Sequence, residues 1–560
     1  MSPSEPGWRF PSWFPGLAMP PGYSWRQVSK DLVAALVVTL VLIPSAIAYS
    51  DLAKCPPAAG LWAALGGMVV FAFFTSSRHV INGPDAAIAL MVGAAVADLG
   101  GGDPARAVAI STWLALLTGL LLVLAAWFKL GAAADFLANP VMLGFMNGAA
   151  LVIIISQLGK LSGISLTEEN SLLKAHEWIT KLSQTHGPTF GLGLAFMAVL
   201  TAMKVWWRSI PGAIVVFTLA LVAGRLIDFE NHGFGVIGKI DLAIPSSVPP
   251  GLSLRDAANL LVAAIGLAFL VFPEGIVLGR SIATKHGYNI DPNRELIALG
   301  SANLAAGMLR GFAVGASQSR SLLNESTGGG SQLVSLLAGG MLIFIVVVLD
   351  AWIASLPTVA IGAILTFTGF TLVDAVAVRR LRAMRRTEAS IAMLTTLGVV
   401  ALGVLPGVFL GVFLSLARLL GQLARPHDAL LGRIDESDAF HDVGDGQVRT
   451  IPGLVVYRFY GPLIFANIRF FVDRLEHFIG RDTEPVRQVY LDASAIPEID
   501  VTAVEELKAF IGRLHSRGIR FRVFKARLPL REAFASLGLS EYLESTSPSW
   551  KQWASEQHEH

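Results

Sequence analysis

Two short stretches of the chain combine residue types that could hold an anion away from water. Residues 82–87 (NGPDAA) contain Gly and Pro, which can interrupt the backbone, and Pro suits the first turn of a following helix. Residues 314–321 (VGASQSRS) place several hydroxyls and one arginine at a predicted helix start. The free N–H groups of a helix N-terminus attract anions. We therefore predict that both stretches open half-helices whose N-termini face a bound anion.

Each stretch also has a simpler interpretation, an ordinary loop for the first and a polar extracellular turn for the second. The run after residue 85 is short and rich in alanine, and Arg320 would supply a positive field in apolar surroundings, so the site interpretation is favoured at both. The predicted binding residues of the two stretches are Pro84, Asp85, Ala86, Ala87, Ser317, Gln318, Ser319 and Arg320.

A carboxylate and a hydroxyl stand inside other apolar runs. Glu274 interrupts an apolar segment, at a cost of about 2.5 to 3.5 kcal/mol for a charge at the centre of a spanning helix. We expect it to bind a coupling proton or sodium ion, or to orient the site; the alternative is a pair with Arg280 near the helix end. For Glu325, a solvated or paired position is equally expected. Ser45 follows Pro44 and could bond freed backbone or face the cavity, so it joins the predicted binding residues.

The composition of the chain requires most of it to face lipid. Of its 560 residues, 53% are hydrophobic and 15% are charged, and its mean hydropathy is +0.60. The net charge of +2 gives no reason to expect nucleic-acid binding, and the single cysteine, Cys55, excludes an intramolecular disulfide. The sequence shows no nucleotide-binding glycine loop, zinc motif or catalytic triad spacing. We therefore expect neither an enzyme nor an ATP-driven pump, and no cofactor beyond a coupling H⁺ or Na⁺.

Uncharged runs long enough for a bilayer recur along the chain, since about 20 apolar residues span its core. The first seven lie at 31–51, 54–78, 85–98, 106–129, 135–160, 186–204 and 208–225. The second set lies at 256–274, 295–310, 315–325, 325–350, 350–374 and 388–418, the last split in two by a predicted turn at 405–407. Seven crossings in each half predict a 7+7 inverted repeat, whose short third segments point to a midplane binding site.

The distribution of Lys and Arg sets the expected orientation. The densest cluster lies at 379–386, which should be cytoplasmic, and alternation then places both termini in the cytoplasm. The loops that hold Lys174, Lys181 and Lys239 are expected on the extracellular side. The chain is thus expected to be a multi-pass protein of the inner cell membrane. Beyond residue 425 the composition becomes that of a soluble domain, with strands predicted at 453–459, 463–466, 489–492 and 519–524 and helices at 470–479, 501–517 and 530–537.

Several motifs resemble the SulP sulfate-permease family of anion transporters, to which prestin and pendrin are related. They are residues 42–49 (LIPSAIAY), 56–62 (PPAAGLW), 75–79 (TSSRH), 293–296 (NREL) and 327–329 (TGG), together with the Ser319-Arg320 pair and the position of Glu274. Ser45 stands where Gln is commoner in that family. Residues 491–494 (LDAS) and 499–503 (IDVTA) are similar to the hallmark of a STAS domain. Its regulatory serine would fall at Val501, which leaves Asp500 and Thr502 as the candidate regulatory residues.

This resemblance implies a fourteen-helix membrane fold with core and gate domains, an anion bound between the third and tenth segments, and a cytoplasmic α/β STAS domain. The expected domains are a cytoplasmic segment (1–30), the transmembrane anion-transport domain (31–425), the STAS domain (426–545) and a tail (546–560). We expect a secondary carrier with elevator-type movement, coupled to protons or sodium or exchanging anions, that forms a homodimer and meets a cytoplasmic partner through the STAS domain. The alternatives are an anion channel and a membrane-anchored signalling protein. The sequence does not choose among sulfate, bicarbonate, chloride and dicarboxylates.

Overall fold

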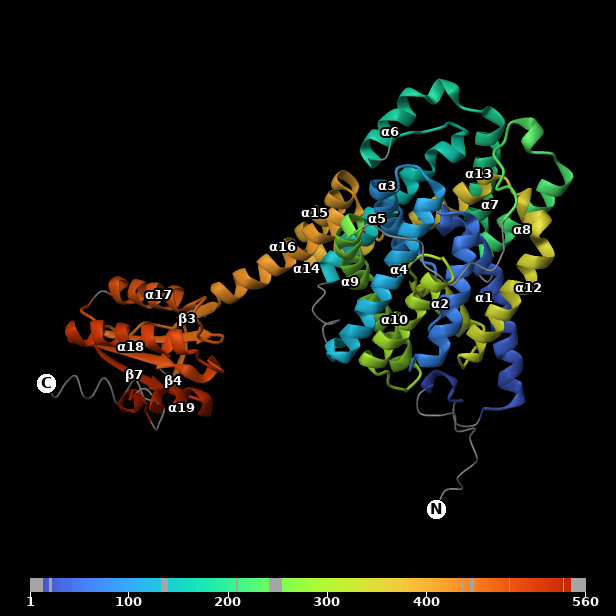
Figure 1. The fold of residues 1–560 in the computed structure, drawn as a ribbon. Helices are drawn as coiled ribbons and strands as arrows, with labels where there is room; N and C mark the ends of the chain where they lie inside the picture. The colour runs from blue at the N-terminus through green and yellow to red at the C-terminus, as the bar shows by residue number, and fades with distance from the viewer. Residues whose placement is uncertain are drawn as a thin grey trace, which may run out of the picture. The chain divides into compact units, whose positions relative to one another are not determined.

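The computed structural model describes residues 14–19, 23–131, 139–168, 170–207, 210–240, 254–434, 437–443, 448–482, 484–536 and 538–544. The chain divides into two compact units, Met1–Leu414 and Ser415–His560, and each is described by itself (Figure 1).

Among the described residues, the first unit is built from two sets of seven main helices, most of them apolar. The first set is α1 (Trp25–Leu52), α2 (Pro57–Phe74), α3 (Ala86–Gly100), α4 (Pro104–Trp127), α5 (Asn139–Ser162), α7 (Gly187–Trp206) and α8 (Gly212–Leu226). The second set is α9 (Leu254–Lys285), α10 (Pro292–Met308), α11 (Gln318–Ser326), α12 (Leu333–Ala354), α13 (Thr358–Leu372), α15 (Arg386–Leu402) and α16 (Val404–Ala424), whose last turns extend into the second unit. Two short helices without buried residues, α6 (Ser171–Thr180) and α14 (Ala375–Met384), lie in the connections. The fourteen-segment 7+7 prediction is confirmed for the described chain.

The third helix of each set is the interrupted one, as the sequence predicts. A two-residue strand precedes each, β1 (Asn82–Gly83) before α3 and β2 (Gly315–Ala316) before α11. Among the described helices, eight are individually long and apolar enough to cross a membrane, and neither α3 nor α11 is one of them. Both start inside the unit rather than at its surface, because the residues of β1 and β2 are buried.

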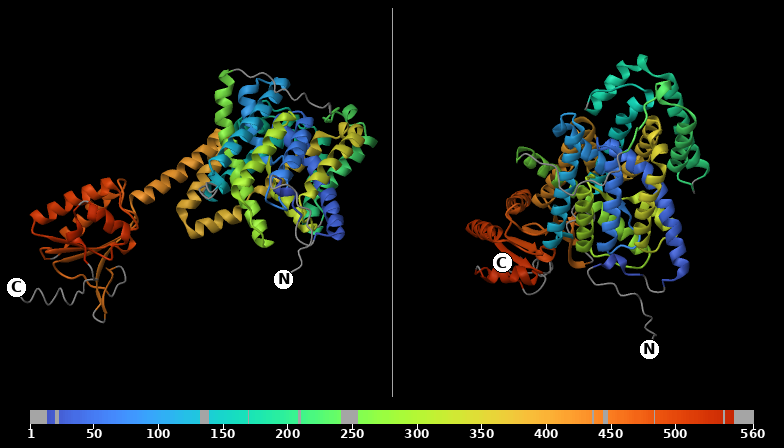
Figure 2. Two further views of the ribbon diagram at one scale, coloured as in Figure 1. Left: turned by 60° about the horizontal axis from the view of Figure 1, so that its bottom comes forward. Right: turned by 45° about the vertical axis from the view of Figure 1, so that its right-hand side comes forward.

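Helices from the two halves of the sequence pack extensively against each other, in addition to the contacts within each half. Helix α10 packs on α2 and α4, and α12 packs on α1. Together with α3, α9 and α11, these helices form the core domain. Helix α5 packs on α13 and α15, and α7 on α8 and α13, which forms the gate domain. The views in Figure 2 show this exchange as blue helices lying beside yellow-green ones.

Two helix boundaries differ from the sequence prediction. Helix α9 runs on to Lys285, beyond the predicted end of its run at 274, and Glu274 lies within the helix, next to Pro273, as its interruption of an apolar segment predicts. The break between α15 and α16 lies at Gly403 and not at 405–407. Gly403 has a φ of +99°, a conformation open to glycine, while Pro406 falls in the first turn of α16, where its missing N–H costs nothing.

The second unit contains a five-stranded sheet in the order β4-β3-β5-β6-β7. Its strands are β3 (His427–Ile434), β4 (Ser437–Asp442), β5 (Leu454–Tyr460), β6 (Gln488–Asp492) and β7 (Arg520–Phe524), and its helices are α17 (Ile468–Arg481), α18 (Val501–Ser516) and α19 (Leu528–Ser536). Strands β5, β6 and β7 are parallel, while β3 is antiparallel to β4 and β5. This is the predicted α/β domain, with β3 and β4 added.

Side chains on the two faces of this sheet alternate, as the period of two in a strand requires. Val455, Tyr457 and Phe459 of β5 pack in the core formed with the three helices, whereas Leu454 and Val456 belong to a smaller cluster. The strand predicted at 463–466 is wrong: Leu463 forms only an isolated bridge with Ile499, and a turn follows it. Asn467 imposes that turn, because its side chain accepts from the Ile464 N–H and donates to the Pro462 carbonyl.

Candidate anion-binding site

The two half-helices begin at a shared two-stranded ladder. Strands β1 and β2 pair antiparallel, with Asn82 opposite Ala316 and Gly83 opposite Gly315. The ladder is extended on one side, where the Ser317 N–H donates to the Ile81 carbonyl at 2.9 Å. Because α3 follows β1 and α11 follows β2, the two predicted stretches are brought together at one place inside the membrane unit.

Arg320 is the charged residue that joins the two stretches. Its side chain comes from α11 and is 1% exposed, and its Nη2 donates to the Pro84 carbonyl at 2.6 Å. Its Nη1 lies 3.5 Å from Ser45 Oγ of α1, a long contact. The guanidinium Nε has no hydrogen-bond partner among the described residues. A buried cation with an unused donor is a costly arrangement that a bound oxyanion would satisfy.

The N-terminus of α11 is open. Ser317 is its N-cap residue, and no side chain in the described part of the chain caps the first turn. The hydroxyl oxygens of Ser317 and Ser319 are 3.4 Å apart, and Gln318 and Ser319 are exposed although Ser317 is buried. Free N–H groups and hydroxyl donors therefore stand at the surface of the site next to the buried guanidinium.

The N-terminus of α3, in contrast, is capped by the carboxylate of its N-cap residue, Asp85. Asp85 Oδ1 accepts a hydrogen bond from the Ala87 N–H at 3.1 Å, which makes Asp85 the N-cap of the helix. Ala86 and Ala87 are buried, and Pro84 contributes its carbonyl to Arg320 rather than to a ligand. All predicted residues of the first stretch thus lie at the site, but one of them brings a negative charge.

Glu274 reaches the same place from α9. A Cβ added at the adjacent Gly275 would lie 3.6 Å from Cβ of Ala316 in β2, so the helix passes directly beside the ladder. Glu274 as a residue is half-buried, but its Oε2 is buried and has no hydrogen-bond partner among the described residues. Glu274 and Arg320 each interact electrostatically with Asp85. Two carboxylates therefore share the site with one guanidinium.

The structure adds Tyr49 to the residues expected from the sequence. Its buried side chain interacts electrostatically with Asp85 and Arg320. Tyr49 lies four positions after Ser45 in α1, so the two project from the same face of the helix. Once Ser45 had been selected, the helical period would have identified it. The Ser45 hydroxyl also donates to the Val41 and Leu42 carbonyls at 2.9 Å, next to Pro44, which lies inside the continuous helix α1.

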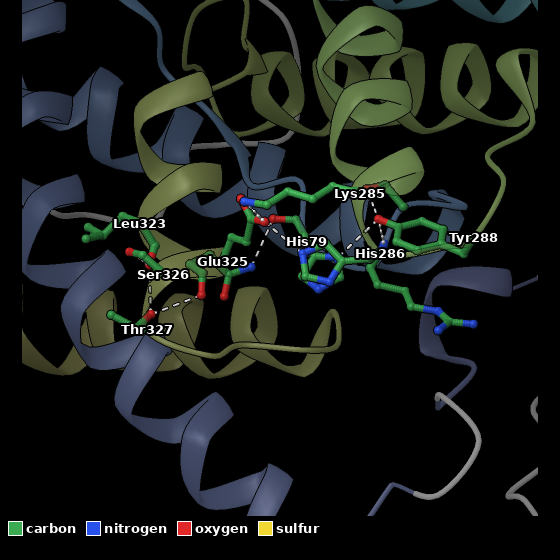
Figure 3. Close-up of polar contacts among 11 residues, drawn as sticks. His79, Lys285, His286, Tyr288, Leu323, Glu325, Ser326 and Thr327 are labelled. Atoms are coloured by element: carbon green, nitrogen blue, oxygen red, sulfur yellow. Dashed lines mark hydrogen bonds and ion pairs between the residues drawn. The ribbon is translucent and has the colours of Figure 1, made fainter.

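A polar cluster holds the far end of α11 (Figure 3). Glu325 pairs with Lys285 and with His286 Nε2, each at 2.7 Å, so its paired interpretation applies. The His286 ring stacks on His79 with centroids 4.4 Å apart, and His79 Nδ1 lies 3.1 Å from the Tyr288 hydroxyl. The half-helix α11 is thereby tied to the end of α9 and to the segment before β1, which fixes the direction of its N-terminus.

The two candidate regulatory residues lie at the start of α18 in the second unit. Asp500 caps this helix through the Ala503 N–H at 2.7 Å and also accepts from the Phe465 N–H at 2.7 Å. Thr502 is exposed in the first turn. A phosphate added there would meet the positive end of the helix, but Asp500 already occupies that end.

Comparison with known proteins gives two family-model matches. A model described as the sulfate permease family matches residues 28–395, and a model described as the STAS domain matches residues 446–552.

Individual proteins match the chain over nearly its whole length. A protein of Mycobacterium tuberculosis named as a probable sulfate transporter is 36% identical over 528 residues, which are 94% of each chain. The chloroplastic sulfate transporter 4.1 of Arabidopsis thaliana is 26% identical and matched over 94% of this chain and 79% of its own. The solved structure of the murine solute carrier 26 family member A9, described as an anion transporter in the inward-facing state, has a TM-score of 0.87 at 20% identity, covering 95% of this chain and 92% of that one.

Proposed function

We propose that this chain, which belongs to the sulfate permease family of anion transporters and ends in a STAS domain, is a secondary active carrier of small oxyanions. Sulfate is the first candidate substrate, because relatives in Mycobacterium tuberculosis and Arabidopsis thaliana carry that name. Bicarbonate and dicarboxylates belong to the same class of planar or tetrahedral oxygen anions. The proposal assigns the anion to the space between the N-termini of α3 and α11.

One observation carries this assignment: the buried guanidinium of Arg320 keeps a free Nε donor beside the uncapped N-terminus of α11. A guanidinium binds oxyanions through two parallel N–H···O bonds, and helix N–H groups add further donors without adding net charge. Pro84 holds the guanidinium by one nitrogen only, so the remaining edge is available to the anion.

The charges of the site argue for coupling to a cation. With Asp85, Glu274 and Arg320 all ionised, the site has a net negative charge that would repel an anion. A proton on one carboxylate removes this repulsion, and the carboxylate whose Oε2 lacks a partner, Glu274, is the one we assign to it. A sodium ion between the two carboxylates would have the same electrostatic effect. Binding of the cation and the anion would then be mutually favourable.

The remaining proposals concern assembly. We propose that both termini and the STAS domain are cytoplasmic, that the chain lies in the inner cell membrane as a homodimer, and that the core domain moves against the gate domain during transport. To test the orientation, single cysteines would be introduced as Lys181→Cys and Arg382→Cys after Cys55→Ala. Only Lys181→Cys should react with an impermeant maleimide added to intact cells, and labelling of Arg382→Cys instead would reverse the orientation. Light scattering of the detergent-solubilised chain at the mass of a monomer would contradict the dimer.

Transport itself is tested with the full chain in proteoliposomes. Labelled sulfate should accumulate against its gradient when an inward proton or sodium gradient is imposed, with saturation, and a panel of unlabelled anions should rank by competition. Flux that neither saturates nor accumulates would make the chain an anion channel. Deletion of the residues after 430 should leave some transport, whereas complete loss of transport in a correctly inserted variant would oppose the carrier assignment of the membrane unit.

A further inference from the structure

A second site of positive charge lies at the other end of α3. A cavity of about 320 Å³ opens between the core and gate domains, lined by Lys54 and Asp51 at the end of α1, Lys160 at the end of α5, and Lys174 in α6. The lining thus includes three lysines and one aspartate. By the orientation proposed above, this is the extracellular end of the unit.

The cavity runs along α3, the half-helix whose N-terminus lies at the site of Arg320. Its wall includes Leu90 and Ala97 of α3, which begins at Ala86. At 1.5 Å per residue, these positions lie about 6 and 17 Å along the helix from its N-terminus. Gly93, between them, lets α3 contact the Leu52 carbonyl of α1, where any Cβ would collide with that oxygen. The end of α1 that carries Asp51 and Lys54 is therefore fixed against α3.

One ion pair crosses the cavity. Lys160 Nζ contacts Asp51 Oδ1, which joins α5 of the gate domain to α1 of the core domain. The two side chains are 29% and 36% exposed, so water and small solutes can reach them. A carboxylate already bound to this ammonium shows that the position accepts a negatively charged oxygen, and such a partly solvated pair is weak enough to be exchanged for another anion.

A buried amide with an unused acceptor oxygen lies in the cavity wall next to Lys160. Gln157, one turn before Lys160 and also in the cavity wall, is 2% exposed, and its Oε1 has no hydrogen-bond partner among the described residues. Its Nε2 donates to Ser156 Oγ at 3.0 Å. A half-turn of the amide would present the NH₂ group to the cavity instead. The Ser156 hydroxyl, which now donates to the Ile153 carbonyl at 2.7 Å, would then have to turn and donate to the amide oxygen, and Gln157 could offer a donor to an anion.

We propose that this cavity is an outer anion-binding site, in which a small oxyanion takes the place of the Asp51 carboxylate on Lys160 before it enters, or after it leaves, the site at Arg320. The inference rests on the proposed function, since the ligand is the transported class of anion. The lysines raise the local anion concentration, and exchange at Lys160 separates the core and gate domains at this end. Binding of the outer anion thus breaks the contact that closes the passage to α3.

Opposite substitutions at the ion pair give the test. Uptake of labelled sulfate would be measured in right-side-out and inside-out vesicles carrying the full chain. Lys160→Gln removes the cation and should raise the KM for extracellular sulfate by about five- to tenfold. Asp51→Asn removes the competing carboxylate and should lower the same KM by about two- to fivefold. Neither variant should change the KM from the cytoplasmic side.

Lys181→Gln is the matched control, because Lys181 lies on the same predicted face, pairs with Glu177 at 2.7 Å, and does not line the cavity. It should leave both KM values unchanged. If Lys160→Gln and Asp51→Asn shift the extracellular KM in the same direction, or shift both sides equally, the pair is only a structural tie and the outer site is refuted. The absence of sulfate uptake by the unmodified chain would instead count against the proposed function.

A binding measurement separates the two sites without transport. In detergent, the Arg320→Gln variant should retain part of the equilibrium binding of labelled sulfate, and adding Lys160→Gln should remove that part. Adding Lys181→Gln should not. If Arg320→Gln alone abolishes all sulfate binding, the cavity binds no sulfate and the inference is wrong. The same conclusion follows if the binding that remains in Arg320→Gln is unaffected by Lys160→Gln.

Discussion

The N-termini of α3 and α11 have nearly the same backbone surroundings and opposite chemistry. Each follows one strand of the same ladder, yet α3 is capped by the carboxylate of Asp85, while α11 has no side-chain cap and carries the guanidinium of Arg320 one turn in. The inverted repeat thus supplies two equivalent helix ends, and the sequence places a carboxylate at one and a guanidinium at the other. Under the proposed function, this difference lets the guanidinium end bind the anion while a coupling cation neutralises one of the nearby carboxylates.

The largest effect is expected where the anion side of this comparison is removed. Arg320→Gln should raise the KM for sulfate about 100-fold, since a buried charge-assisted contact is lost. Arg320→Lys keeps the charge without the planar fork, so its KM should lie between those of the unmodified chain and of Arg320→Gln. Concentration-dependent uptake in proteoliposomes measures this. An unchanged KM in a folded Arg320→Gln protein would remove the residue from the site.

The cation side is tested next. Glu274→Gln mimics the neutral carboxyl permanently, so accumulation driven by a pH gradient should fall more than about tenfold while exchange of internal for external sulfate continues. Driven accumulation and exchange are measured on the same vesicles. Driven accumulation is measured first with a proton gradient and then with a sodium gradient. If driven uptake in the variant keeps the pH and sodium dependence of the unmodified chain, Glu274 does not carry the coupling ion.

A smaller change of opposite sign is expected at Asp85. Asp85→Asn keeps a side chain that caps helices equally well but removes a negative charge next to the anion, so the KM for sulfate should fall about three- to fivefold. Asp85→Ala would also lose the cap, at about 1 kcal/mol of stability, which a thermal melt would detect. A higher KM for Asp85→Asn would mean that the carboxylate orients the anion site rather than opposing it.

The smallest effect is expected at Ser45. Its oxygen lies 3.5 Å from Arg320 Nη1, beyond good hydrogen-bond distance, and its hydroxyl already bonds within α1. Ser45→Ala should change the sulfate KM by no more than about twofold. A change as large as that of Arg320→Lys would show that Ser45 contacts the anion directly.

The sequence was sufficient for features that depend on local pattern. Apolar run length identified the fourteen segments, and the matched short third segments located both half-helices. Composition alone marked the change near residue 425. Boundaries were harder wherever several residues could end a helix, as at Gly403, because a glycine three residues ahead of a proline moves the break away from the proline.

Features that depend on long-range contacts were not accessible in the same way. Asp85 looked like part of an anion-binding turn, and only its bond to the Ala87 N–H shows it to be a cap. The contact between Arg320 and the Pro84 carbonyl joins residues 236 positions apart, which no local period can reveal. In the second unit, β3 and β4 escaped prediction because their charged, irregular sequence lacks the nearly continuous apolar run of β5 and β6.

The β1–β2 ladder also constrains how the protein is made. The Ile81 N–H next to it is satisfied by the Ser321 hydroxyl, 240 positions later in the chain. Until that partner has been synthesised and inserted, the N-terminal half carries unpaired amide groups at the depth of the hydrocarbon, where each costs several kcal/mol. Biogenesis of this protein should therefore pass through a stage in which the first seven segments are in the bilayer but open in the middle, waiting for the second half to close them.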